Sequence, residues 1–486
     1  MDKREHVISN FLWRFCERFG SQLVTLVVSF LLARMLDVEV YGLTSKVAVI
    51  TAVLLVFVDS GMGNALIQKK DPDDLDFSSV FYFNVCFCLL LYAALFFASP
   101  AISRMYREPE LTPILRVLGL TVVVSGVKNV QQAYVSKTMQ FKRFFFASLG
   151  GTLPSAALGI FMARRGFGVW ALVAQQLSNV TLNTAILWLT VDWRPIRAFS
   201  LERLKGLLSF GWKLLAASLL DTIYLKIYPL IIGIRYTNAD LAFYERGNYI
   251  PSLITENINS SIDSVLLPVL SEQQDQKDQV REIARRAIKT SSYIMMPLMA
   301  GLAVCAEPLV RFLLTDKWLP CVPFLQVFCV VYAFYPMHTA NLNAIKAMGR
   351  SDVFLRLEII KKVLETSVLL ITVHYGVLAM ALGELGCSIA SQLINAWPNR
   401  RLLDYPYLRQ LQDMLPAILL SGAMAAAVWT VTRLGLGDVL TLLIQVSLGA
   451  ALYVLGSWAL KLDSFVFLLS MAKKLQRRKA GGESDG

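Results

Sequence analysis

Charged and amide side chains recur at helical spacing inside segments that are otherwise apolar enough to cross a membrane. One such stripe runs through about residues 243–270, and a second through residues 384–395. Positions three, four or seven apart share one face of a helix, so each segment presents a polar face. A carboxylate is costly in hydrocarbon, so these faces must meet a water-filled cavity or a neighbouring helix. The stripes consist of Asn248, Ser252, Glu256, Asn259, Ser260 and Asp263, then Glu384, Ser388, Ser391, Gln392 and Asn395.

The composition indicates an all-α integral membrane protein. Hydrophobic residues make up 56% of the 486 positions and charged residues 17%, against roughly 25% charged in soluble domains. Windows of about 20 residues predict about fourteen transmembrane helices. The predicted spans are 12–36, 44–66, 78–99, 112–135, 144–163, 169–190, 213–234, 243–270, 287–306, 321–345, 357–374, 378–397, 415–434 and 438–460.

The distribution of lysine and arginine predicts the orientation in the membrane. Most loop cations fall in the loops on the same side as Met1, which places both termini in the cytoplasm. The first apolar stretch contains Arg14 and Arg18 and lacks a small-residue cleavage site, so it is interpreted as a retained helix. The net charge of +12 is spread over short loops. It therefore reflects topology, and we expect no nucleic-acid partner.

A faint internal repeat predicts two lobes. Phe19-Gly20 opens the first span and Phe210-Gly211 the seventh, and six helices per unit bring both units back to the same side of the membrane. This gives a parallel repeat, with two lobes expected to face each other across a central cavity. The predicted organisation is an N-lobe of six helices (1–190), a cytoplasmic linker (191–212), a C-lobe of six helices (213–397), two further helices (398–460) and a cytoplasmic tail (461–486).

The chain resembles the polysaccharide transporters of the multidrug/oligosaccharidyl-lipid/polysaccharide exporter superfamily, particularly the Wzx-like flippases of lipopolysaccharide and teichuronic acid synthesis. The resemblance lies in an ordered set of short motifs over nearly the whole chain and fades after about residue 400. The motifs are Arg18-Phe19-Gly20, Leu32-Ala33-Arg34-Met35-Leu36, Tyr41-Gly42, Asp59-Ser60-Gly61, Ala65-Leu66-Ile67-Gln68-Lys69-Lys70, Phe81-Tyr82-Phe83-Asn84, Phe141-Lys142-Arg143-Phe144, Gly168-Val169-Trp170-Ala171-Leu172-Val173, Tyr244-Glu245-Arg246-Gly247 and Leu267-Pro268-Val269-Leu270-Ser271.

The resemblance implies a two-lobed bundle in the bacterial inner membrane. It also implies that the protein passes a polyprenyl-diphosphate-linked oligosaccharide from the inner to the outer leaflet by alternating access. Membrane lipid is the other expected partner. A diphosphate requires cations in a cavity of low dielectric constant, and sugar hydroxyls require amides, carboxylates and aromatic faces.

Four cations inside predicted spans are candidate diphosphate contacts. Arg14 and Arg18 lie one turn apart in the first span, and Lys128 lies at the polar end of the fourth. Lys226 lies thirteen residues into the seventh span, too deep to reach the interface easily. Asp221 would point about 140° away from Lys226 around the helix, so the two should not pair. Snorkelling to the interface remains an alternative for Arg14, Arg18 and Lys128, and a buried interhelical ion pair remains one for Lys226.

Three classes of function compete. A flippase is favoured, a cation-coupled drug exporter of the same superfamily is second, and a polysaccharide polymerase-type membrane enzyme is third. A membrane enzyme should have a large outer loop with clustered His, Asp or Arg. The predicted outer loops are short and lack such a cluster, so we expect no enzymatic activity. Seven scattered cysteines and three histidines predict no metal site or cofactor. Carboxylates such as Asp221, Glu256 and Glu384 could couple transport to either protons or sodium ions.

Overall fold

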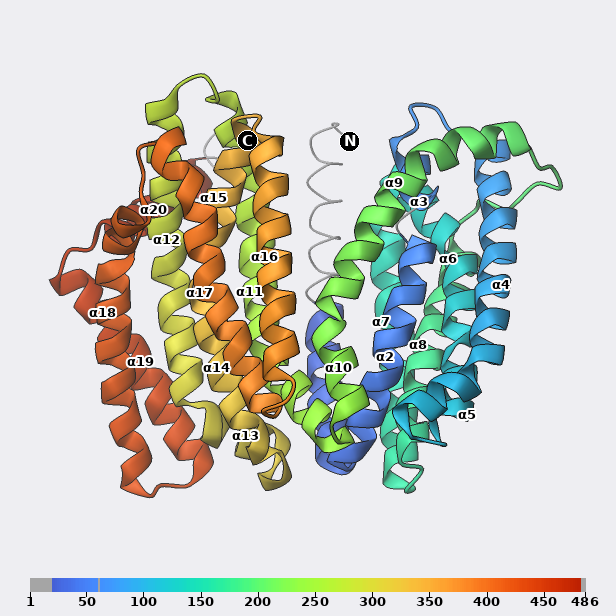
Figure 1. Ribbon diagram of the computed structural model, residues 1–486, viewed down its shortest axis with the longest axis horizontal. Helices are drawn as coiled ribbons and strands as arrows, with labels where there is room; N and C mark the ends of the chain where they lie inside the picture. The colour runs from blue at the N-terminus through green and yellow to red at the C-terminus, as the bar shows by residue number, and fades with distance from the viewer. Residues whose placement is uncertain (1–19, 60–61, 482–486) are drawn as a thin grey trace. The chain divides into compact units, whose positions relative to one another are not determined.

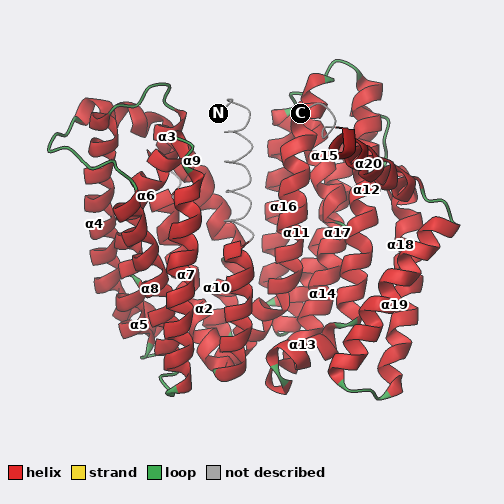
Figure 2. Cartoon of the chain, turned by 180° about the vertical axis from the view of Figure 1, so that it is seen from behind, coloured by secondary structure: helices red, strands yellow, loops and turns green. Residues whose placement is uncertain are grey.

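The computed structural model describes residues 20–59 and 62–481, and this part of the chain is helical with no strand (Figure 2). In hydrocarbon every backbone N–H and C=O needs a partner within the protein, and a helix supplies these partners within one segment. Long apolar stretches therefore fold as helices. The predicted all-α membrane architecture is confirmed.

The chain divides into two compact units, residues 1–242 and 243–486. In the first unit, an apolar helix over Gly20–Met35 precedes the helices labelled in Figure 1. These are α2 (Val38–Asp59), α3 (Met62–Gln68), α4 (Asp74–Tyr106), α5 (Leu111–Leu118), α6 (Leu120–Lys137), α7 (Phe141–Arg164), α8 (Val169–Thr190), α9 (Leu201–Leu225) and α10 (Ile227–Arg235). Helices α7 and α8 pack closely along each other, as do α4 and α6.

The second unit contains nearly all of the long helix α11 (Asn238–Glu272) and the helices that follow it. Within this unit α12 packs on α18, and α16 packs on α17. The elements are α12 (Lys277–Val304), α13 (Ala306–Leu314), the short 3-10 helix η1 (Asp316–Cys321), α14 (Val322–Ala333), α15 (Tyr335–Ala347), α16 (Ser351–Thr372), α17 (Val377–Leu402), α18 (Tyr407–Val431), η2 (Thr432–Leu434), α19 (Asp438–Ala459) and α20 (Asp463–Gly481).

Nine helices within residues 20–59 and 62–481 are long and apolar enough to cross a membrane. The count is ten if Leu201–Ser209 and Gly211–Leu225, which meet at 47°, form one span. Helices α8, α11 and α16 have spanning length but fall outside this apolar class. Each predicted span from 44–66 onward lies on helix, whereas the count of fourteen stays a prediction.

The linker predicted at 191–212 is fixed against the start of α4. The backbone N–H of Ile196 donates to Ser78 Oγ at 3.0 Å, and that of Ser200 donates to Ser79 Oγ at 2.9 Å. Ser200 in turn caps α9 through its hydroxyl. These contacts fix the start of α9 within the first unit, where the helix packs on α2 and α3. The internal repeat in the sequence predicts that residues 213–234 belong to the second lobe. The boundaries of the two lobes stay a prediction.

Asp413 anchors α18 to α12. The Arg285 guanidinium makes two hydrogen bonds to the Asp413 carboxylate, at 2.7 and 2.8 Å. Tyr405 donates its hydroxyl to the same carboxylate at 2.8 Å, and Lys289 Nζ lies 3.4 Å from it. Lys289 also lies 3.6 Å from Asp463, the first residue of α20. One carboxylate therefore organises the packing of the C-terminal helices.

Candidate functional site

Helix α11 carries exposed carboxylates in its middle and C-terminal half. Glu256 lies 18 residues after Asn238 and 16 before Glu272, which is about 25 Å from either end of the helix. Glu256 and Asp263 are both exposed, and they lie seven residues apart on one face. A carboxylate exposed at that depth cannot face hydrocarbon without a large cost. This face of α11 is therefore the candidate site.

Three hydrogen bonds tie the polar face of α11 to other helices of the second unit (Figure 1). Tyr244 donates its hydroxyl to Glu384 on α17 at 2.8 Å. Tyr332 on α14 donates to Asn248 at 2.9 Å, and the Asn343 amide on α15 donates to Asp263 at 2.6 Å. Residues of both polar stripes predicted from spacing are therefore hydrogen-bonded to other helices of the same unit.

Asn259 has a buried side chain whose two amide atoms lack a hydrogen-bond partner among the described residues. Such an amide costs about 1–3 kcal/mol if nothing satisfies it. It lies between Glu256 and Asp263 in the sequence of α11. Its amide is therefore available to a water molecule or to a polar group of a ligand.

Further polar groups line the same unit on α15, α16 and α17. The His338 ring nitrogen Nδ1 and the Asn395 amide lie 2.6 Å apart. Lys361 is 4% exposed and lies 2.6 Å from Glu358, one turn earlier on α16. The second unit thus combines hydroxyls, amides and carboxylates in its interior with the buried cations Lys361 and Arg246.

Lys226 lies in the first unit at an interruption between α9 and α10. The hydropathy pattern predicts one continuous span over 213–234, whereas α9 ends at Leu225 and Lys226 is its C-cap. Its side chain is half-buried and forms no ion pair within residues 20–59 and 62–481. Asp221 is exposed four residues before the end of α9, and no ion pair joins it to Lys226 in the described part. Breaks of this kind expose backbone groups that can bind ions or charged substrates.

Of the other three cations predicted to contact the diphosphate, the structure describes only Lys128. Lys128 is half-buried on α6, which continues to Lys137, so it lies inside the helix and not at its end. Arg14 and Arg18 lie outside the described residues.

A buried cation that sequence reasoning missed is Lys46 on α2. Its side chain is 2% exposed, and its Nζ lies 3.4 Å from Glu108 and 5.4 Å from the centre of the Tyr106 ring. The Asn238 amide donates to the same Glu108 carboxylate at 2.7 Å. The sequence signal that could have identified this buried cation is a lysine inside the predicted apolar span 44–66. The cluster ties α2 to the loop that follows α4 and to the first residue of α11, which gives it a role in architecture.

The chain is similar to several bacterial proteins of polysaccharide biosynthesis. It is 24% identical to the teichuronic acid biosynthesis protein TuaB of Bacillus subtilis over 354 residues, 72% of each chain. It is 22% identical to the succinoglycan biosynthesis transport protein ExoT of Rhizobium meliloti, covering 83% of this chain and 82% of that one. The lipopolysaccharide biosynthesis protein WzxC of Escherichia coli is 25% identical, covering 81% and 80%.

Solved structures show the same fold. The lipid II flippase MurJ in an inward closed conformation matches with a TM-score of 0.75 at 15% identity, covering 93% of this chain and 99% of that one. An inward-facing multidrug resistance transporter of the MATE family matches with a TM-score of 0.59 at 14% identity, covering 80% and 98%. The family model described as polysaccharide biosynthesis protein matches residues 31–323, more than half of the sequence. The chain therefore belongs to this polysaccharide biosynthesis protein family.

Proposed function

We propose that this protein moves a polyprenyl-diphosphate-linked oligosaccharide from the inner to the outer leaflet of the bacterial plasma membrane by alternating access. The observation that carries the proposal is the polar face of α11, on which the carboxylates of Glu256 and Asp263 are exposed. A hydrated cavity would accommodate that face, and a hydrated cavity is what a sugar needs to cross hydrocarbon. The names of TuaB, ExoT and WzxC support a role in polysaccharide biosynthesis, and that of ExoT supports transport.

The interior of the second unit has the chemistry of a sugar site. Tyr332 offers an aromatic face, and Asn248, Asn259 and Glu384 offer amide and carboxylate groups. Sugar hydroxyls both donate and accept hydrogen bonds, so a mixed set of this kind suits them. The diphosphate contacts are proposed to be Lys226, Lys128, Arg14 and Arg18. Both termini are proposed to face the cytoplasm, from the asymmetry of the loop cations.

A cation-coupled drug exporter is the second candidate. The carboxylates Glu256, Asp263 and Glu384, with tyrosines beside them, would also suit a cationic ligand. The fold shared with the MATE transporter is compatible with this function. The half-buried Lys226 and the buried Lys361 favour an anionic substrate instead.

Reconstitution of the purified protein in vesicles separates the two candidates. We expect it to move a fluorescent polyprenyl-diphosphate-linked saccharide between leaflets, measured as loss of fluorescence to a quencher on one side. Vesicles with the same protein should not accumulate a fluorescent organic cation. Cation accumulation without movement of the lipid-linked saccharide would make the drug exporter the correct assignment.

Glu384 is the proposed site of ion coupling. Its carboxylate is half-buried and accepts a hydrogen bond from Tyr244, so gain or loss of a bound ion would alter the contact between α17 and α11. We expect Glu384→Gln to remove the stimulation of transport by an imposed proton or sodium gradient. Transport should be measured with each gradient alone. Tyr244→Phe keeps the carboxylate and should retain stimulation, and a Glu384→Gln protein that still responds fully to a gradient would place coupling elsewhere.

A further inference from the structure

Helix α20, which follows α19 after a short turn, is held against the second unit by its first two turns. Phe465 and Leu468 lie three residues apart and pack against a buried cluster that includes Tyr293 of α12. The Asp463 carboxylate lies 3.6 Å from Nζ of Lys289, which is also on α12. Because these contacts fix one face of α20 against the bundle, the opposite face of the helix is turned outward.

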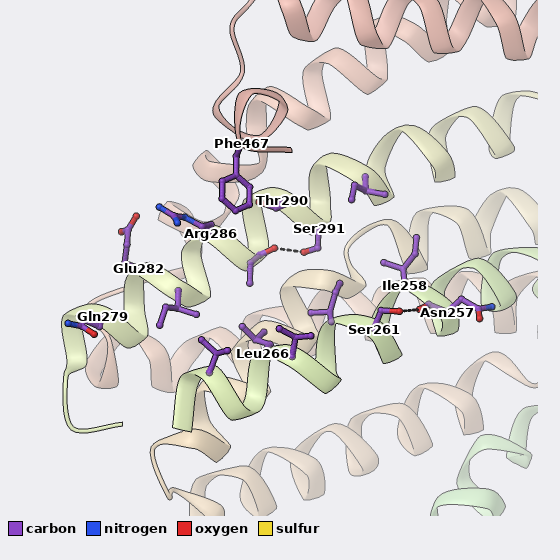
Figure 3. A pocket seen from close by; sticks show the side chains of 16 residues that line it. Asn257, Ile258, Ser261, Leu266, Gln279, Glu282, Arg286, Thr290, Ser291 and Phe467 are labelled. Atoms are coloured by element: carbon purple, nitrogen blue, oxygen red, sulfur yellow. Dashed lines mark hydrogen bonds between the residues drawn. The ribbon is translucent and has the colours of Figure 1, made fainter. Parts of the chain in front are cut away.

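A contact between α12 and α20 positions a cation beside this helix. The guanidinium carbon of Arg286 lies 5.2 Å from the centre of the Phe467 ring, and both side chains line the pocket drawn in Figure 3. This cation–π contact holds the charge at the edge of α20. Arg286 is exposed and forms no ion pair within the described part of the chain. Its positive charge is therefore available to an anion from outside the protein.

The junction between α19 and α20 has the features of a membrane–water interface. Helix α19 is long and apolar enough to cross a membrane, and Trp458 is exposed in its last turn. Tryptophan at the end of an apolar helix is typical of the headgroup level. Lys461, in the turn that follows, is exposed and has a left-handed backbone with φ 46°. The chain therefore turns as it leaves the membrane, and α20 begins at the membrane surface.

The outward face of α20 is apolar near its start and basic further along. Val466, Leu469 and Lys473 are spaced three and four residues apart, so they share one face of the helix. Val466 is 54% exposed and Leu469 42%, so neither apolar side chain is covered by the described residues. Lys473 is exposed and forms no ion pair with them. An apolar strip followed by cations is the pattern of a helix that lies in the membrane interface.

The charge of α20 selects between lipid headgroups. After Asp463 the helix contains no acidic residue and five basic ones, which are Lys473, Lys474, Arg477, Arg478 and Lys479. Arg286 and Lys461 add two exposed cations beside its first turns. A zwitterionic headgroup carries no net charge, whereas an anionic headgroup is attracted by each lysine or arginine near the membrane surface. This surface is therefore complementary to an anionic lipid.

We propose that α20 is a docking surface for anionic phospholipids of the cytoplasmic leaflet. Val466 and Leu469 enter the acyl-chain region of that leaflet. Lys473, Arg286 and Lys461 contact the headgroup phosphates. Because α20 packs on α12, the bound lipid holds the helix in its docked position. The inference goes beyond the proposed function, since it requires a membrane but no saccharide.

Hydrogen–deuterium exchange of the full-length protein in nanodiscs tests the lipid surface. A lipid that binds only the helical, docked form of α20 slows the exchange of its backbone amides. We expect exchange in 466–473 to be about tenfold slower, or more, when phosphatidylcholine nanodiscs also contain phosphatidylglycerol. High salt should remove the difference, because it screens exposed charges. The turn at 273–276 should exchange equally in both lipids.

Variants at exposed positions identify the contacts. Lys473→Gln should reduce the effect of phosphatidylglycerol about fivefold, the value of one cation at an anionic surface, whereas Lys473→Arg should retain the effect. Leu469→Ser should weaken protection in both lipids, because it removes apolar area without changing the buried face of α20. Arg433→Gln is the matched control, since it removes an exposed cation from the connection between α18 and α19, at the other end of α19. It should leave exchange of α20 unchanged.

Three results would overturn the lipid surface. The first is equal exchange of 466–473 in the two kinds of nanodisc. The second is undiminished protection in folded Lys473→Gln and Leu469→Ser proteins. The third is protection in detergent that rises with protein concentration, which would assign the outward face of α20 to contact with a second copy of the chain. The assay contains no saccharide, so loss of export with intact lipid protection counts against the proposed function alone. Normal export with equal exchange counts against the lipid surface alone.

Discussion

Lys226→Ala is expected to lower export of the lipid-linked saccharide by about ten- to a hundredfold per folded molecule. A charge-assisted hydrogen bond contributes about 1.5–3 kcal/mol, and lysine at the end of α9 is positioned to give one to a phosphate. Lys226 forms no ion pair in the described part of the chain. Its removal therefore leaves no uncompensated buried partner, and the amount of folded protein should stay the same.

Two comparisons sharpen the test at Lys226. Lys226→Arg keeps the charge and should retain most of the transport, because a phosphate accepts either cation as a point charge. Lys213→Ala removes an exposed cation from the same helix and should transport normally. Export is measured in vesicles and divided by the folded protein determined by size-exclusion chromatography. Normal export per molecule with reduced abundance would assign Lys226 to architecture and return the phosphate contact to Arg18 or Lys128.

Spacing alone was sufficient to predict that α11 and α17 are polar on one face. Helical periodicity fixes which side chains share a face, and the cost of a charge in hydrocarbon fixes what that face must meet. Periodicity does not identify the neighbour across the interface. Tyr244 and Glu384 are 140 positions apart, and nothing in either segment specifies the other. The sequence therefore predicted the polar faces but not the hydrogen bonds between them.

The interruption at Lys226 had a sequence signal that the hydropathy profile concealed. Pro229 lacks a backbone N–H, and its ring clashes with the carbonyl four residues earlier in a continuous helix. That carbonyl belongs to Leu225, the last residue of α9. The residues around Lys226 are apolar over the length of about 20 residues that a transmembrane helix needs. A hydropathy window therefore predicts one continuous span and does not detect the break. Lys46 was missed for a related reason, since its partner Glu108 lies in a distant loop.

Asp413→Ala is expected to cause a large loss of stability, about 2–4 kcal/mol. The carboxylate is 8% exposed and accepts two hydrogen bonds from Arg285 and one from Tyr405. Removing one partner of a buried pair costs about 3–5 kcal/mol. Arg285 is 44% exposed, so solvent screening reduces that value. The measurement is the midpoint of thermal unfolding in detergent. Glu307→Ala is the control, because its pair with Arg311 is exposed and should contribute less than about 1 kcal/mol.

A double substitution distinguishes the contribution of the Arg285–Asp413 ion pair to stability from that of the helix packing around it. Most of the cost of Asp413→Ala lies in leaving Arg285 without its carboxylate, so Arg285→Ala in the same chain should restore part of the lost stability. Lys289 still has Asp463 at 3.6 Å in that double variant. Additive losses in the double variant would mean that Asp413 acts through Tyr405 and the packing of α18. Recovery would instead make the Arg285–Asp413 pair the link that fixes α18 to α12.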